Sequence, residues 1–339
     1  MLLKFNKFLV FFIFLFVLVF FYNISYAGRT VNINVKIPAN SFIAANGDDS
    51  NNYSAPCEKD SNDNILNLNV APGIKCAICG GAGKGEVVDP NKPESLLEDV
   101  RNNTLNINCN IDNECYLFSG MTSTGTVSSN IVNVYGGGSS TNTEAMVGGG
   151  GVFVSGCAEK NTVNIYKDFS CKGVVGGIIV RTGTSSFNTV NVFSNSNLNI
   201  LELISGGGVH DKGISINNSV NVYGSITAQG TGRDKQSTIS GGNVNGGGSA
   251  TSNRVNIAGT VQSTGNIYII GAKAEHTTGN IVSISGKIAH TEISTKTVTI
   301  IAGSDGSKSA VNNKVIIYET AEIPNKCILY GNVKDIQGN

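Results

Sequence analysis

The sequence is short of the residue types that metal sites and nucleic-acid interfaces need. It has no tryptophan, equal numbers of basic and acidic residues (24 of each), and three histidines that stand far apart, His210, His276 and His290. A structural zinc site needs four ligands, and a nucleic-acid interface needs an excess of basic charge. We therefore expect no metal, no cofactor and no nucleic-acid partner.

Familiar catalytic motifs are missing as well. No Gly-x-Ser-x-Gly nucleophile motif occurs, and the glycine-rich stretch 80–85 lacks the first glycine and the Ser or Thr of a phosphate-binding loop. The Cys-x-x-Cys motif formed by Cys76 and Cys79 has no second pair with which to bind zinc. The sequence therefore predicts no catalytic residues.

Only one long hydrophobic run is present, and it lies at the start. Lys4 and Lys7 precede 15 apolar residues (8–22), and the small residues Ser25 and Ala27 follow. This pattern is typical of a secretory signal peptide, here residues 1–27 with cleavage before Gly28. The run is shorter than the roughly 20 residues that span a bilayer. We expect an exported protein at the cell surface, in the outer membrane or outside the cell, with the periplasm as an alternative.

All eight cysteines follow the predicted signal peptide. An even number of cysteines in an exported chain indicates disulfide bonds. The close pairs Cys109 with Cys115, and Cys157 with Cys171, could each close a loop, although the sequence leaves the pairing open. The candidate disulfide cysteines are Cys57, Cys76, Cys79, Cys109, Cys115, Cys157, Cys171 and Cys327.

The chain is rich in one repeated phrase, Asn-x-Val-Asn-Val or Asn-x-Val-Asn-Ile. Eight copies span 210 residues in seven steps, a mean period of 30 residues. A period of this size indicates a solenoid or a propeller, and propeller blades are longer, at about 40–50 residues. The copies begin at Asn103, Asn130, Asn161, Asn188, Asn218, Asn253, Asn280 and Asn313.

Alternation within the phrase predicts a strand with one buried side. Val163 and Ile165 share one side of their strand, and Asn164 and Tyr166 share the other. Equally spaced strands pair best with their own copies one turn away. The sequence therefore predicts an all-β fold, a parallel β-helix (β-solenoid), right-handed, with residues 28–102 as a less regular N-terminal cap and 103–339 as solenoid repeats. Glycines after the strands are expected to turn the corners through positive φ.

Two rows of side chains should follow the solenoid axis. The eight leading asparagines are expected to form a structural ladder, because stacked amides can hydrogen-bond along the axis. Aromatic residues five positions further on should stack on one outer edge. That row is either a structural stack or a sugar-binding platform, and it comprises Tyr135, Tyr166, Phe193, Tyr223 and Tyr318.

Together the phrases, the Ile-Ser-Gly-Gly stretch 239–242 and the predicted signal peptide resemble the passenger region of Gram-negative autotransporter adhesins and related surface β-helix proteins. The resemblance covers about residues 103–318. Such passengers are followed by a C-terminal membrane barrel, whereas this sequence stops at Asn339 without one. A separate outer-membrane translocator is therefore an expected partner, and a barrel-less fragment of an autotransporter is an alternative.

The resemblance implies an adhesin-like surface or secreted structural protein that binds host glycans or matrix proteins through solenoid faces and loops, such as segment 225–252. The alternative is a carbohydrate-active β-helix enzyme of the lyase or hydrolase type. Such an enzyme needs carboxylates that converge on one groove. The candidate catalytic side chains, four carboxylates and one arginine, occupy different offsets within their repeats: Asp168, Glu202, Asp211, Arg233 and Asp234.

Overall fold

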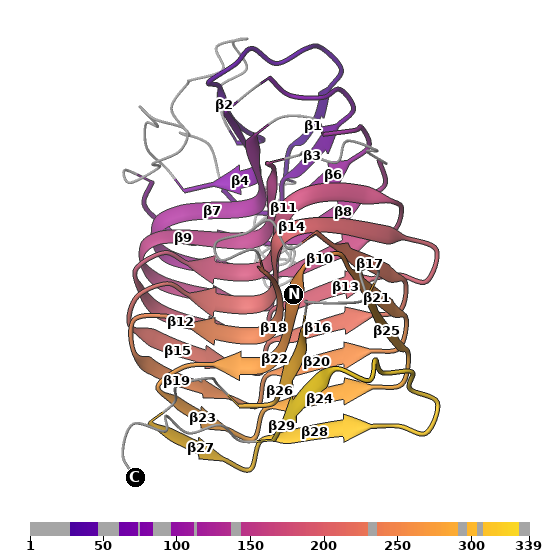
Figure 1. Cartoon of the computed structure of the whole chain (residues 1–339). Coiled ribbons are helices and arrows are strands. Elements are labelled where there is room, and N and C mark those ends of the chain that lie inside the picture. The colour runs from indigo at the N-terminus through magenta and orange to yellow at the C-terminus, as the bar shows by residue number, and fades with distance from the viewer. Residues whose placement is uncertain are drawn as a thin grey trace, which may run out of the picture.

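The computed structural model describes residues 28–46, 61–73, 75–83, 96–111, 114–136, 144–229, 236–290, 297–303 and 308–331. The expected signal peptide, Cys57, Arg233 and Asp234 lie outside these residues. The described residues form strands, turns and bends without any helix, and the strands coil into a stack of parallel rungs (Figure 1). The prediction of an all-β, parallel solenoid is confirmed.

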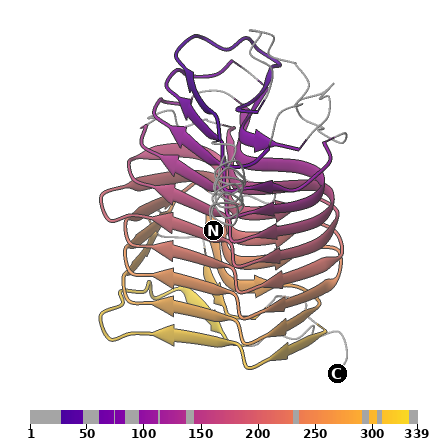
Figure 2. The same cartoon turned by 180° about the vertical axis from the view of Figure 1, so that it is seen from behind.

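One side of the coil is a ten-stranded parallel sheet, built from the repeated phrases. Each strand pairs with its copy on the next rung, so that Val163 pairs with Val190. Figure 2 shows the same stack from behind. In spatial order the strands are β1 (Thr30–Ile33), β3 (Ile65–Leu68), β6 (Thr104–Ile107), β8 (Ile131–Val134), β10 (Thr162–Ile165), β13 (Thr189–Val192), β16 (Ser219–Val222), β20 (Arg254–Ile257), β24 (Ile281–Ile284) and β28 (Lys314–Ile317).

The sheet extends beyond the expected boundary between cap and repeats. β1 and β3 come from the region expected to form the cap. β1 pairs with β3, and β3 pairs with β6, in both cases in parallel and in register. Asn32, Asn67 and Asn106 therefore occupy equivalent positions on three successive strands. The repeat begins at Thr30, although its spacing is less regular there.

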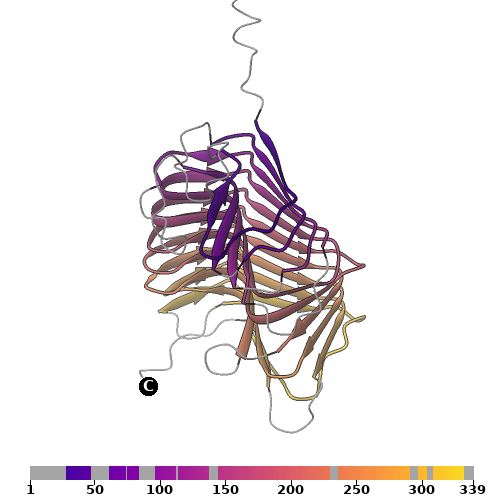
Figure 3. The same cartoon turned by 90° about the horizontal axis from the view of Figure 1, so that it is seen from above.

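The remaining strands close the other sides of each rung, again in parallel pairs (Figure 3). The longest strands bend around a corner. These strands are β2 (Phe42–Ala44), β4 (Cys76–Ala82), β5 (Val100–Arg101), β7 (Cys115–Ser128), β9 (Met146–Glu159), β11 (Phe169–Ile179), β12 (Thr182–Ser186), β14 (Asn197–Val209), β15 (Gly213–Ile216), β17 (Ser225–Ala228), β18 (Gln236–Val244), β19 (Gly248–Thr251), β21 (Thr260–Ser263), β22 (Asn266–Lys273), β23 (His276–Thr278), β25 (Lys287–His290), β26 (Val298–Ile301), β27 (Ser309–Val311) and β29 (Cys327–Tyr330).

The interior of the coil is a continuous apolar column. From β3 to β24, the second and fourth residues of each strand in the ten-stranded sheet are buried, while the first and third face outward. Val132, Val163, Val190 and Val220 each have no exposed surface and belong to one cluster. Burying one such side chain contributes about 1.5–3 kcal/mol. The rungs are therefore held together mainly by this column.

The corner before each phrase is turned by the residue that directly precedes the leading Asn. On eight rungs this residue has a left-handed backbone, with φ between 53° and 64°: Asn102, Ser129, Lys160, Phe187, Asn217, Ser252, Gly279 and Asn312. The expectation that glycines after the strands supply the positive φ is wrong. Gly259 and Gly286 have ordinary backbone angles and are needed for another reason, since a Cβ at either position would collide with the carbonyl oxygen of Gly224 or Gly259 on the preceding rung.

Candidate binding face

The eight leading asparagines lie inside the coil, where they are at most 5% exposed. A ninth member, Asn64, precedes them. From Asn64 to Asn280, each donates from its side-chain Nδ2 to Oδ1 of the Asn on the next rung, at 2.8–3.1 Å, and Asn313 ends the row as an acceptor. The second Nδ2 hydrogen goes to a backbone carbonyl of the previous rung, as from Asn188 to Ala158 at 2.8 Å. We call this row the inner ladder. Its buried amides are hydrogen-bonded on both sides, so it serves the fold rather than a ligand.

The inner ladder explains one glycine in each of several glycine runs. A Cβ on Gly177, Gly207 or Gly242 would lie about 2.5 Å from the Cγ atom of the ladder Asn that faces it. Such contacts are sterically impossible without movement of the backbone or of the amide. The glycines therefore leave room for the buried side chains of Asn188, Asn218 and Asn253.

A second row of asparagines lies on the outer side of the ten-stranded sheet. The predictions made from the sequence did not single it out. Each member after the first donates from Nδ2 to Oδ1 of the Asn on the preceding rung at 2.7–3.1 Å, opposite in direction to the inner ladder. The signal was the second Asn, which six of the eight phrases contain. We call this row the outer ladder, and its members are Asn32, Asn67, Asn106, Asn133, Asn164, Asn191, Asn221 and Asn256.

The predicted aromatic row lies beside the outer ladder, two residues further along each rung. The Tyr135 and Tyr166 rings stack with centroids 5.0 Å apart, and the Tyr166 and Phe193 rings stack at 4.6 Å, with interplanar angles of 5° and 10°. Burial, and then the neighbouring Tyr135, raises the pKa of Tyr166. Tyr223 and Tyr318 follow at the equivalent position and are 51% and 52% exposed.

Stacking limits what this row can bind. Tyr166 has a parallel ring on each side, so neither of its faces is available to a sugar. Only a ring that lacks such a neighbour could offer a flat surface to a ligand. The stacked part therefore contributes to stability, and the central ring, Tyr166, cannot serve as a sugar-binding surface.

The outer side of the ten-stranded sheet, which we call the ladder face, carries few charges. Its strands contain only two charged residues, Arg254 and Lys314, both at strand starts. On the successive strands β10, β13 and β16, Thr or Ser lies beside the asparagines, and Thr189 and Ser219 are hydrogen-bonded at 3.1 Å across neighbouring rungs. Isoleucine takes the same position on three other rungs. The face is thus an ordered array of hydroxyl and amide groups with nearly no charge.

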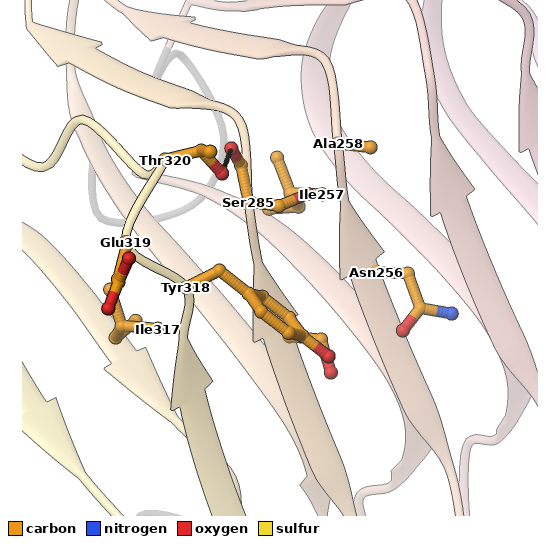
Figure 4. A pocket seen from close by; sticks show the side chains of 9 residues that line it. Asn256, Ile257, Ala258, Ser285, Ile317, Tyr318, Glu319 and Thr320 are labelled. Atoms are coloured by element: carbon orange, nitrogen blue, oxygen red, sulfur yellow. Dashed lines mark hydrogen bonds between the residues drawn. The ribbon is translucent and has the colours of Figure 1, made fainter.

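The aromatic row is interrupted on two rungs, where Ala258 and Ser285 replace the rings. Beside them is an open hollow of about 750 Å³, lined by residues that follow or belong to β20, β24 and β28 (Figure 4). Thr320 Oγ1 donates to the carbonyl oxygen of Ser285 at 2.9 Å and holds the segment after Tyr318 against the preceding rung. The hollow is a concave part of the ladder face that a small ligand could enter.

The cysteines do not form the expected bonds. No disulfide joins any two of the seven described cysteines, so neither Cys109 with Cys115 nor Cys157 with Cys171 is bonded. Cys115 and Cys171 point into the apolar column, and burial raises the pKa of both thiols. Cys157 lies instead in the half of β9 that pairs with β12. The members of the second pair therefore lie in different parts of the rung.

The candidate carboxylates have separate local contacts. Asp168 accepts a hydrogen bond from the backbone N–H of Asn197 at 2.8 Å, and Glu202 lies 3.7 Å from Lys172 Nζ. Asp211 is exposed beside His210. The described residues contain no group of three or more His, Cys, Asp or Glu side chains that could hold a metal ion.

Segment 225–252 is not the loop that was expected. It contains β17, β18 and β19, which pair in parallel with strands of neighbouring rungs. A function carried by the described part of this segment, 225–229 and 236–252, would therefore lie mainly on strand faces.

Comparisons with family models, with curated proteins and with solved structures find no match to this chain. Within the described ranges, no helix has the length and hydrophobicity to cross a membrane. The argument about function therefore depends on the geometry of the chain itself.

Proposed function

We propose that the protein is an exported structural protein of the adhesin type, which binds host glycans or matrix proteins through its solenoid surface. The observation that supports this most directly is the ladder face. Ten strands at about 4.8 Å spacing give an ordered surface about 43 Å long. Long exposed faces of this kind are what repeat proteins use for binding.

The chemistry of the ladder face favours an uncharged, hydroxyl-rich or amide-rich ligand. Its outward groups are mainly amides and hydroxyls, which can donate and accept hydrogen bonds with sugars and peptide backbones. With two charged residues in its ten strands, it offers little attraction to a strongly charged partner. Glycans and extended matrix proteins fit this description.

Export and binding can be tested separately. The protein should leave the cytoplasm, and the mass of the exported protein should equal that of a chain that begins at Gly28. The purified exported protein should bind immobilised host glycans or matrix proteins, and replacing Asn221 and Asn256 by Lys should weaken binding to that face. A protein that stays in the cytoplasm at full mass contradicts export, and an exported protein that binds none of these ligands contradicts the adhesive function.

A further inference from the structure

The interruption of the aromatic row leaves a hollow beside two rungs. Tyr223 and Tyr318 are three rungs apart, about 14 Å at the usual strand spacing. Ala258 and Ser285 occupy the two positions between them, where β8, β10 and β16 are followed by tyrosine. The small side chains expose the rung edges, and the resulting hollow is of the size usual for small-ligand sites.

The outer ladder ends at the same hollow. Asn256 donates to Asn221 Oδ1 at 2.8 Å, but the next rung carries Ser283 in place of Asn. Among the described residues, none donates to Asn256 Oδ1. Asn256 and Ser283 both line the hollow, so a hydrogen-bonded chain of amides presents its last acceptor there. A chain of this kind is polarised along its length, which strengthens the terminal acceptor.

Tyr318 supplies an apolar surface beside these polar groups. Its side chain is half exposed and reaches across the hollow in the direction of Asn256 (Figure 4). Glu319 and the hydroxyl-bearing Ser285 line the same space. The lining residues include one acidic side chain and no basic one. An anionic ligand would therefore be repelled.

From this geometry we propose that the hollow between the β20, β24 and β28 rungs binds a neutral pyranose unit of a glycan. The C–H face of the sugar packs on the Tyr318 ring, as apolar surfaces pack on aromatic side chains. Its hydroxyl groups donate to Asn256 Oδ1 and Glu319 and exchange hydrogen bonds with Ser283 and Ser285. This inference rests on the proposed glycan-binding function and assigns it to one place.

The experiment uses the exported protein on an array of neutral and acidic oligosaccharides, followed by calorimetric titration with the neutral oligosaccharides that bind. Ala258→Tyr puts into the hollow the residue that the same row carries elsewhere, next to Tyr223. This variant should keep its fold and lose at least tenfold in affinity. Tyr318→Ala, at a half-exposed position, should give a similar loss. Tyr135→Ala, at the far end of the same row, is the matched control and should leave affinity unchanged.

The outcomes separate this inference from the proposed function. If the unmodified protein binds glycans and both Ala258→Tyr and Tyr318→Ala leave the affinity unchanged, the hollow is not the site, although the adhesive function stands. Tighter binding of acidic than of neutral sugars overturns the ligand class. If the unmodified protein binds no glycan but does bind a matrix protein, the sugar site is overturned and the adhesive function stands. Binding to neither overturns both proposals.

Discussion

Asn161 donates two hydrogen bonds to one oxygen atom of Asn188, from its backbone N–H at 3.0 Å and from its side-chain Nδ2 at 2.9 Å. Both residues are fully buried, one rung apart. The same pair of hydrogen bonds links each leading Asn to the next, so a single buried oxygen accepts from two donors that water cannot reach. Losing a side chain from the inner ladder should therefore cost much more stability than losing one from the outer ladder.

Asn188→Ala should therefore be strongly destabilising. It removes the acceptor of two Asn161 hydrogen bonds, so the backbone N–H and one of the two Nδ2 hydrogens are buried without a partner, at about 1–3 kcal/mol each, while Nδ2 keeps its bond to the Val127 carbonyl oxygen. We expect a total loss of about 3–5 kcal/mol, measured from the urea unfolding midpoint. Asn191→Ala, in the outer ladder three residues later, is the matched control, since water can replace its bonds, and it should cost less than about 1 kcal/mol. Equal losses for the two variants would contradict the distinction.

The adjacent glycines Gly207 and Gly208 should respond differently to alanine. A Cβ on Gly207 would meet Asn218 Cγ at 2.5 Å, whereas the nearest atom to a Cβ on Gly208 is the Asn243 carbonyl oxygen at 3.7 Å. Gly207→Ala should cost about 2–3 kcal/mol through overpacking. Gly208→Ala should change stability by no more than about 0.5 kcal/mol. Thermal unfolding of the two variants in parallel measures the two losses of stability. A larger loss for Gly208→Ala than for Gly207→Ala would show that the Asn218 side chain can move to make room for a Cβ.

Phe187 is a bulky residue in a left-handed conformation, with φ of 56° and 53% exposure. At this position three other rungs have Asn, which tolerates that conformation better. Phe187→Asn should therefore raise the free energy of unfolding by about 1 kcal/mol. Phe187→Ala separates the causes, because it removes the exposed ring but keeps a Cβ and gains no local hydrogen bond. If Ala stabilises as much as Asn, the ring and not the backbone was responsible.

Tyr166 should make the protein sensitive to alkaline pH. Burial, and then the nearby Tyr135, raises the pKa of its phenol in the folded state. Above the unfolded pKa near 10, the unfolded chain releases this proton more readily than the folded one, so stability falls as pH rises. Tyr166→Phe should reduce this alkaline loss while keeping the ring stack at neutral pH. Unfolding midpoints between pH 8 and 11 measure the difference, and identical pH profiles would contradict it.

The fold was largely predictable, because a recurring strand leaves few choices. The spacing of Asn161, Asn188 and their equivalents sets the length of a rung, and the alternation of Val163 with Asn164 decides which side chains face inward. Parallel pairing of identical strands follows from both. The extension of the sheet to β1 was missed because loops of differing length hide the period in the first hundred residues.

The sequence by itself determined the period, the strand faces and the positions of the two Asn rows. Only the tertiary structure decided what those positions do. Corner geometry turns one row inward and leaves the other outside, and it selects the residue that takes the left-handed backbone. Strand alternation sends Cys115 and Cys171 into the apolar column, where they do not form the expected disulfides. The hollow beside Ser285 and Tyr318 arises because residues distant in the chain are stacked at strand spacing, a relationship that no single repeat contains.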